Sequence, residues 1–301
     1  MSICAMTSGI TDPEILAFIA EVDGLTPPGT VVATIAEQRA LYDAMSAYFR
    51  APRPQGLSVR DASIARVPCR IYEGGSRGQI VFLHGGGFVV GGLDSHDDVA
   101  AEIAVATQAS VTAVDYRLAP EHLHPAAFDD ALAVTRAIAA PVVLVGDSAG
   151  GTLAASVAWT LRGQRSVAGQ VLIYPSLGGL ALDLPSYTDC AGAPLLTTAD
   201  IHAYGGLRTG GAPDDTDPTQ RVLAAIDHIG TAPTFISAAG VDPLRDDGLA
   251  YRDRLLAAGS QAECWIEEQL PHMWLRARHR TARGAAAFER VLDAVKRLIA
   301  R

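Results

Sequence analysis

The sequence predicts an α/β protein with a mostly parallel, doubly wound central sheet, helices on both faces of that sheet, and a helical cap. Three observations support this prediction. Short apolar, β-rich runs alternate with amphipathic helical segments from residue 79 onward, which is typical of parallel strands joined by helices. Apolar residues make up 49% of the 301 residues, enough to fill an extensive core. Gly, Pro and Asp clusters interrupt the alternation over residues 178–228.

The first fifty residues carry helical periodicity in two pieces. These pieces are Glu14–Val22 and Thr34–Phe49, and Gly24, Pro27, Pro28 and Gly29 separate them. Glycine and proline break helices, so two short helices are expected here. After Pro52 and Pro54 the pattern becomes β-rich, and Ser58–Tyr72 alternates as two early strands.

The remaining elements follow in alternation. Six further strands are expected at Gln79–Leu83, Ser110–Tyr116, Val142–Val145, Gln170–Tyr174, Thr234–Ala238 and Ala262–Ile266. Five helices are expected at Asp97–Thr107, Pro125–Ala139, Ala149–Leu161, Leu244–Ala258 and Thr281–Leu298. We therefore predict a core formed by 51–177 and 229–301, an N-terminal helical cap segment at 1–50, and a cap insertion at 178–228.

Charge and composition exclude several classes of function. The formal net charge is −9, from 33 acidic and 24 basic residues, so nucleic acid is not an expected partner. An anionic substrate would need a local basic pocket, which the sequence does not announce. The N-terminus has no basic region followed by a long apolar run, and no stretch of 18 apolar residues occurs. Neither a secretory signal nor a membrane span is expected.

The four cysteines give no sign of a metal site or a disulfide framework. Cys4, Cys69, Cys190 and Cys264 lie far apart and include no CxxC pair. They are interpreted as reduced thiols of a cytoplasmic protein. His122 and His124 resemble an H-x-H metal pair, but this is weak evidence, and no metal or organic cofactor is expected. The sequence leaves a homodimer open.

The sequence VVLVGDSAGG, at 142–151, carries the strongest local signal. Gly146, Ser148 and Gly150 form G-x-S-x-G between a β-rich run and a helical segment. In that context the serine lies on a strained turn with its hydroxyl exposed at the carboxyl edge of the sheet. The nearby helix N-terminus favours developing negative charge. Taken alone, the pattern also fits an ordinary serine in a glycine-rich turn.

A second signal is HGGG at 84–87, directly after the predicted strand Gln79–Leu83. Consecutive glycines allow backbone amides to point into a cavity without side chains in the way. Preorganised N–H donors stabilise the oxyanion of acyl transfer by a few kcal/mol. Gly86, Gly87 and Ala149 are the natural donors, and a flexible turn is the alternative interpretation.

Together the motifs resemble those of the bacterial hormone-sensitive lipase family of esterases, which have the α/β-hydrolase fold. HGGGF (84–88), DYRLAPE (115–121), GDSAGG (146–151) and DPLRDD (242–247) occur in the family's order over roughly residues 75–280. The resemblance implies Ser148 as nucleophile, Asp242 as the acid, His272 as the base, and Gly86, Gly87 and Ala149 as the oxyanion hole. It also implies that His84 organises the loop rather than transferring protons.

Chain order supports the same triad. An α/β-hydrolase triad runs serine, acid, histidine along the chain, and Asp242 follows the apolar run TFISAAG. Asp246 and Asp247 fall on the next helix and are expected to face solvent or cap it. Of the histidines after Ser148, His202 and His228 precede Asp242. His279 lies in the basic run RARHR, interpreted as a solvated helix start, which leaves His272.

Two residues next to the predicted triad also have predicted roles. Asp147, beside the nucleophile, is expected to make structural hydrogen bonds. Family members often have Gly-Phe after the catalytic histidine, whereas Met273 and Trp274 follow His272 here. Trp274 is therefore either a packed core aromatic or a wall that shortens the acyl pocket.

The predicted function is hydrolysis of short-chain acyl esters, of about two to six carbons, by a serine carboxylesterase acting on a small-molecule ester. Amide or lactone hydrolysis on the same machinery is an alternative. A ligand receptor, like the plant gibberellin receptors that resemble this family, is a second one, but those receptors lack the catalytic histidine. A lipase acting at lipid interfaces would need an exposed apolar lid, and none is evident in 1–50 or 178–228.

Overall fold

The computed structural model describes residues 9–25, 34–139, 141–164 and 166–300. They contain an eight-stranded sheet in the order β1-β2-β4-β3-β5-β6-β7-β8. Its strands are β1 (Ser58–Ile64), β2 (Val67–Glu73), β3 (Gln79–Leu83), β4 (Ser110–Val114), β5 (Val142–Asp147), β6 (Val167–Ile173), β7 (Thr234–Val241) and β8 (Ala262–Pro271). β2 pairs antiparallel with β1 and β4, and every other neighbouring pair is parallel. The predicted sheet is confirmed.

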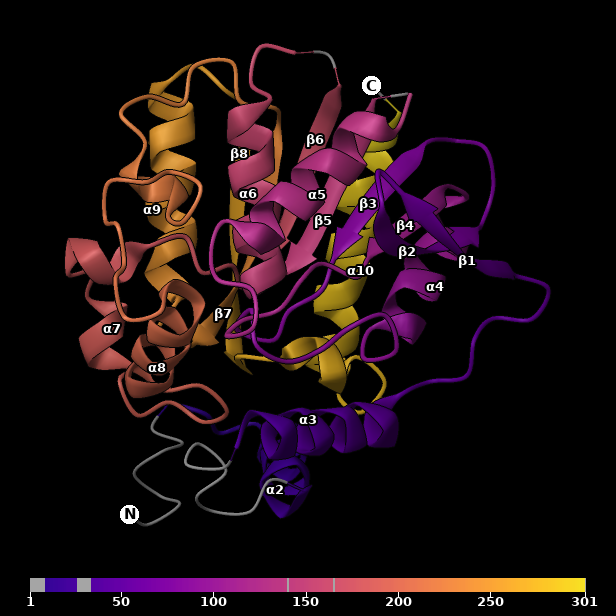
Figure 1. Cartoon of the computed structure of the whole chain (residues 1–301). Coiled ribbons are helices and arrows are strands. Elements are labelled where there is room, and N and C mark those ends of the chain that lie inside the picture. Colours follow the sequence, from indigo (N-terminus) through magenta and orange to yellow (C-terminus); the bar gives the residue numbers. More distant parts are fainter. Residues whose placement is uncertain (1–8, 26–33, 140, 165, 301) are drawn as a thin grey trace.

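Helices cover both faces of this sheet (Figure 1). α4 (Asp97–Thr107) and α10 (Ala282–Ile299) pack on one face, and α5 (Ala126–Ala137), α6 (Ala149–Thr160) and α9 (Arg245–Ala257) pack on the other. The side chains of β5 alternate between the two cores: Val143 and Val145 join the first, and Val142 and Leu144 join the second. Every residue of β5 is consequently buried, as expected of a central parallel strand.

The remaining helices gather at one end of the sheet, the lower end in Figure 1. They are α2 (Pro13–Leu25), α3 (Ile35–Phe49), α7 (Ser186–Asp189) and α8 (Thr198–Thr209). The described residues also form the 3-10 turns η2 (Gly179–Leu182), η3 (Val222–Ala224) and η4 (Trp274–Ala277). Thr34 caps α3 in a capping box with Glu37, which explains why this helix starts where it does. The predicted breakers Pro27, Pro28 and Gly29 lie outside the described residues.

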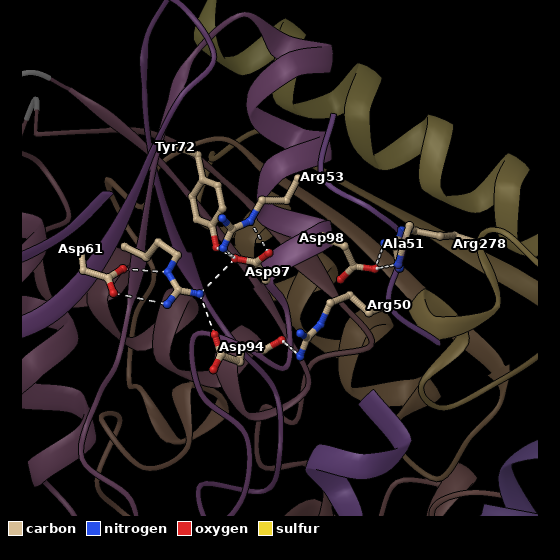
Figure 2. A network of polar contacts seen from close by, with 10 residues as sticks. Arg50, Ala51, Arg53, Asp61, Tyr72, Asp94, Asp97, Asp98 and Arg278 are labelled. Carbon is tan, nitrogen blue, oxygen red and sulfur yellow. Dashed lines mark hydrogen bonds and ion pairs between the residues drawn. The ribbon is translucent and has the colours of Figure 1, made fainter. Parts of the chain in front are cut away.

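A charged network fixes the segment that leaves α3 against the sheet, as Figure 2 shows. Asp97, in the first turn of α4, accepts hydrogen bonds from Arg53, Arg70 and Tyr72 at 2.6–3.0 Å. Asp98 accepts from the backbone N–H of Ala51 and pairs with Arg278. The two carboxylates also lie at a helix N-terminus, where negative charge is favoured. The segment that follows α3 is thus held against α4 and, through Asp97, linked to β2 by defined contacts.

Two expectations about charged residues are wrong. Asp247 does not face solvent but is fully buried, because the backbone N–H groups of the loop at 177–179 need an acceptor there. The run RARHR is not a solvated helix start. Arg276 and Arg278 are buried, and α10 begins only after Thr281, whose side chain caps the N–H of Gly284.

Candidate active site

Ser148 sits at the junction of β5 and α6, in a backbone conformation that L-residues rarely adopt. Its φ is 51° and its ψ is −118°, which costs about 1–3 kcal/mol unless the surroundings enforce it. The flanking glycines permit the turn. A Cβ at Gly146 would collide with the carbonyl group of Gly150, and one at Gly150 would collide with the carbonyl oxygen of Leu83 on β3. The G-x-S-x-G pattern is therefore required by close backbone approach.

The loops after β5, β7 and β8 bring three predicted side chains together. The hydroxyl of Ser148 lies 3.0 Å from Nε2 of His272, and Nδ1 of His272 lies 2.7 Å from Oδ2 of Asp242. Asp242 is fully buried, and its other oxygen accepts the backbone N–H of Leu244 at 2.9 Å. Because the carboxylate accepts the Nδ1 proton, Nε2 is left free to accept the proton of the serine hydroxyl.

The three predicted oxyanion donors surround the same hydroxyl. Gly86, Gly87 and Ser148 line one cavity, and Gly87, Ser148 and Ala149 line the next. Within the described residues, no group accepts a hydrogen bond from the backbone N–H of Gly86, Gly87 or Ala149. Gly86 and Gly87 have φ of 127° and 60°, and a Cβ on Gly87 would press on the ring of Tyr204. Only glycine fits at both positions.

Buried polar groups hold the HGGG loop in place. Asp147 accepts the backbone N–H of Gly85 at 2.9 Å and contacts His96 at 3.3 Å, which agrees with the structural role expected for Asp147. Burial acts to raise the pKa of Asp147, but His96, Arg276 and His84 together outweigh it and the pKa lies below its usual range. The hydroxyl of Tyr116, from the DYRLAPE motif, donates to the carbonyl oxygen of His84 at 2.6 Å.

His84 is not available for proton transfer. Its ring stacks on Tyr116 with centroids 4.2 Å apart, and its Nδ1 lies 2.8 Å from the carbonyl oxygen of Gly85. Burial lowers the pKa of His84 to about 4, so the ring is neutral at ordinary pH. The ring therefore has a packing role next to the oxyanion glycines.

Two cavities meet at Ser148. The first, of about 360 Å³, lies under α2, α3 and α8 and is mostly apolar; Leu41, Met45, Val90, Leu207 and Met273 are among its lining residues. The second, of about 220 Å³, runs on the other side of Tyr204 between α8 and the loops around 176–180 and 211–221. The two sides of a bound ester could thus occupy different cavities, one on each side of the hydroxyl.

The other candidate residues lie outside this constellation. His279 is half exposed and bonds Glu102, whereas Asp246 accepts the backbone N–H of Ser186. His124 bonds Asp217 and Thr219 rather than forming a pair with His122. Trp274 is fully buried against Tyr174 and does not line either cavity. Of its two predicted roles, it has that of a packed core aromatic. Met273 lines the first cavity instead.

The described part of the chain contains no group of three or more His, Cys, Asp or Glu side chains arranged to hold a metal ion. None of its helices is long and apolar enough to cross a membrane. Cys69, Cys190 and Cys264 are free thiols there, and Cys4 lies outside the described residues.

Sequence reasoning missed several residues of the site. Tyr42 and Tyr204 line the first cavity, and His96 supports Asp147 from beneath the loop. Arg208 lines the second cavity although it is nearly buried. No short motif marks these positions, because each depends on where a distant helix folds back over the sheet.

An elbow serine, a hydrogen-bonded histidine and acid, and unpartnered loop amides define a serine hydrolase of the α/β-hydrolase class. A family model described as alpha/beta hydrolase fold matches residues 80–276. Carboxylesterase NlhH of Mycobacterium tuberculosis is 39% identical over 71% of this chain and 74% of its own length. Carboxylic ester hydrolase LipN of the same species is 34% identical over 93% of this chain and 80% of its own.

Comparison with solved structures gives the same result. An esterase from the bacterial hormone-sensitive lipase family superposes with a TM-score of 0.86 and 26% identity, over 96% of this chain and 99% of that one. The chain belongs to this bacterial hormone-sensitive lipase family of α/β-hydrolases. The predicted fold and family are confirmed.

Proposed function

We propose that this carboxylesterase cleaves short-chain acyl esters through a two-step acyl-enzyme mechanism at Ser148. The observation that carries the proposal is the continuous hydrogen-bonded chain from Ser148 through His272 to Asp242, with distances of 3.0 Å and 2.7 Å. A serine hydroxyl is a weak nucleophile until a base accepts its proton. The elbow conformation and the buried acid give this base a fixed orientation.

In the first step, Nε2 of His272 accepts the proton as the oxygen of Ser148 attacks the ester carbonyl. Asp242 holds the Nδ1 proton and stabilises the imidazolium that forms. The imidazolium then protonates the leaving alcohol as the ester C–O bond breaks. In the second step a water molecule attacks the acyl-enzyme, His272 accepts its proton, and Ser148 leaves with that proton as the acid is released.

The negative charge of each tetrahedral intermediate falls on the former carbonyl oxygen. The backbone N–H groups of Gly86, Gly87 and Ala149 are the proposed donors, supported by their lack of partners within the described residues. Ala149 is also the first residue of the twelve-residue helix α6, whose N-terminus favours negative charge. A single donor of this kind contributes about 3–4 kcal/mol to the transition state.

Substrate size follows from the cavities. The N-terminal segment and the 178–228 insertion supply α2, α3 and α8, and we assign them the role of a cap over the carboxyl edge of the sheet. Residues of these helices line the first cavity, whose volume is about 360 Å³. Each methylene buried there contributes about 0.8 kcal/mol until the space is full. We place the preferred acyl chains at about two to six carbons, the short-chain range expected from the sequence.

A graded series of p-nitrophenyl esters, acetate to palmitate, tests the proposal at monomeric substrate concentrations. We expect kcat/KM to rise and then fall, with its maximum at short chains. A maximum at ten carbons or more would contradict the closed pocket and favour a lipase. The matching p-nitroanilides test the amidase alternative, and we expect them to react far more slowly because amines leave less readily than alcohols.

A further inference from the structure

The two cavities that meet at Ser148 differ in the charge of their walls. The residues that line the first include three acids, Asp23, Asp147 and Asp200, and no lysine or arginine. The second is lined by Arg208 and Arg221 and by no aspartate or glutamate. The chain as a whole carries a formal charge of −9, so the second cavity is a local exception to the sign of the protein. The second cavity is therefore a local basic pocket, which no sequence motif indicates.

Of the two arginines, Arg208 is the better candidate for binding an anion, because it is nearly buried and makes no ion pair with the described residues. Only 8% of the residue is exposed, and its guanidinium stacks over the ring of Phe88 at 3.9 Å. Among the described residues, no carboxylate oxygen lies within 4.0 Å of it. Arg221, in contrast, already pairs with Asp215. Asp217 acts to raise the pKa of Arg208, but its carboxylate bonds His124 rather than the guanidinium. A buried cation without a direct ion pair is energetically costly, and an anion that reaches it relieves that cost.

The hydrogen bonds of Arg208 leave it capable of binding a ligand. Nη1 donates to the carbonyl oxygen of Gln220 at 2.9 Å, and Nη2 donates to Thr219 and to Nδ1 of His124. A guanidinium has five N–H groups, so Nε–H and one N–H of Nη1 remain without a partner in the described residues. Burial lowers the pKa of Arg208 to about 9, which still leaves it charged at neutral pH.

His124 lies between Arg208 and the carboxylate of Asp217. Because Nδ1 of His124 accepts from Arg208, its proton resides on Nε2, which donates to Asp217 at 3.0 Å. Burial and the nearby Arg208 both lower the pKa of His124. Asp217 does not line the second cavity, so the charged side chains that do line it are both arginines.

We propose that the second cavity binds a carboxylate carried by the substrate, with Arg208 as its counter-charge. The inference rests on the proposed esterase function and names its substrate class: esters with an uncharged acyl chain, which occupies the first cavity, and one free carboxylate on the alcohol side, which occupies the second. A single guanidinium without a direct ion pair matches a single negative charge. The acidic residues of the first cavity disfavour a carboxylate there, which favours this orientation of the substrate.

Paired substrates test this proposal by measuring one ratio, kcat/KM for a carboxylate ester divided by kcat/KM for its carboxamide isostere. One arm uses monoethyl esters of dicarboxylic acids with two to five methylenes, which carry the charge on the acyl side. The other arm uses butanoate esters of ω-hydroxy acids of the same lengths, which carry it on the alcohol side. We expect a ratio of about ten to one hundred in the alcohol-side arm at the best length, the range of a charge-assisted hydrogen bond, and a ratio of about one or below in the acyl-side arm.

Variants then assign the effect to its residue. Arg208→Gln should bring the ratio to about one or below, and Arg208→Lys should retain part of it. The matched control is Arg162→Gln, since Arg162 also stacks on an aromatic ring, Trp159, at 4.1 Å but does not line either cavity. That control should leave the ratio unchanged. If Arg208→Gln does not fold, inhibition of the wild-type protein by glutarate, absent for glutaramide, provides the second measurement.

The outcomes separate this proposal from the esterase function itself. Turnover of the carboxamide esters with a ratio at or below one in the alcohol-side arm would overturn the inference and leave the esterase function standing. A ratio that is unchanged in Arg208→Gln would also overturn it. Absence of turnover for every ester would instead contradict the proposed function.

Discussion

The carboxylate of Asp147 accepts a hydrogen bond from the backbone N–H of Gly85 at 2.9 Å. This contact joins two parts of the site that lie 62 residues apart in the chain. Asp147 directly precedes the nucleophile, and Gly85 directly precedes the first proposed oxyanion donor. One side chain thus connects the strand end that carries the proposed nucleophile to the loop that carries two of the proposed oxyanion donors.

We expect Asp147→Asn to lower kcat about tenfold to hundredfold while KM changes less than about threefold, since oxyanion contacts act in the transition state. The measurement is steady-state kinetics with p-nitrophenyl butyrate. Asp130→Asn is the control, because Asp130 also accepts a backbone N–H, from Arg117, away from the HGGG loop. Equal effects of the two substitutions would show that Asp147 serves folding alone.

Alanine substitutions of His272 and His279 should differ widely in their effect on kcat/KM. His272→Ala removes the base that lies 3.0 Å from Ser148, and we expect a loss of roughly ten-thousandfold in kcat/KM. His279→Ala should stay within about twofold, because its half-exposed ring contacts only Glu102 among the described residues. Comparable losses in both variants would contradict the assignment of the base.

The position of Met273 in the first cavity predicts a shift in acyl preference. Met273→Ala enlarges the cavity, so the chain-length maximum should move to longer acyl groups, with about fourfold in kcat/KM for each added methylene that fits. Trp274→Ala should leave the maximum in place and lower the free energy of unfolding by about 3–5 kcal/mol, as for other buried aromatics. A maximum that moves only in Trp274→Ala would reverse the roles of the two residues.

Asp247 predicts a pH-dependent stability. Burial raises the pKa of its carboxyl to about 7, against the four hydrogen bonds donated to it by Leu177, Gly178, Gly179 and Tyr187. The unfolded chain has the ordinary aspartate pKa of about 3.9. Between these values the folded state holds the proton more tightly, so the contribution is fully present below pH about 4 and lost as pH rises through about 7.

Urea unfolding of the wild type and of Asp247→Asn, from pH 4.5 to 8, isolates this contribution from that of other groups. The stability of the wild type relative to the variant should increase as the pH falls. A constant difference across the range would mean that the donated hydrogen bonds keep the carboxyl ionised throughout.

The sheet and its helices were predictable because parallel strands buried on both faces leave compact apolar runs. Gln79–Leu83 and Asp97–Thr107 have the predicted bounds. β7 and β8 extend beyond the predicted runs, and β6 starts three residues earlier and ends one residue earlier than predicted. The residues brought together around Ser148 were predictable because motif order identifies them. Asp242 and His272 each follow a strand, and strand ends meet at one edge of the sheet.

The walls of the site were not predictable from local patterns. Met273 adopts φ of 63°, which turns the chain so that Met273 faces the cavity and Trp274 enters the core. Arg208 looks like an ordinary basic residue in the last turn of α8, and only the fold places Phe88 beneath it. Asp247 follows a helix start, where acids are usually solvated, but it accepts N–H groups from about 70 residues away.

The most direct test of the central claim is the turnover of p-nitrophenyl butyrate by Ser148→Ala. The control is Ser156→Ala, another serine on α6, whose hydroxyl donates to Pro218 away from the cavities. The account predicts that Ser148→Ala retains less than about a hundredth of wild-type kcat/KM with a native circular dichroism spectrum, whereas Ser156→Ala remains active. A correctly folded Ser148→Ala protein that hydrolyses the ester at a rate near that of the wild type would contradict it.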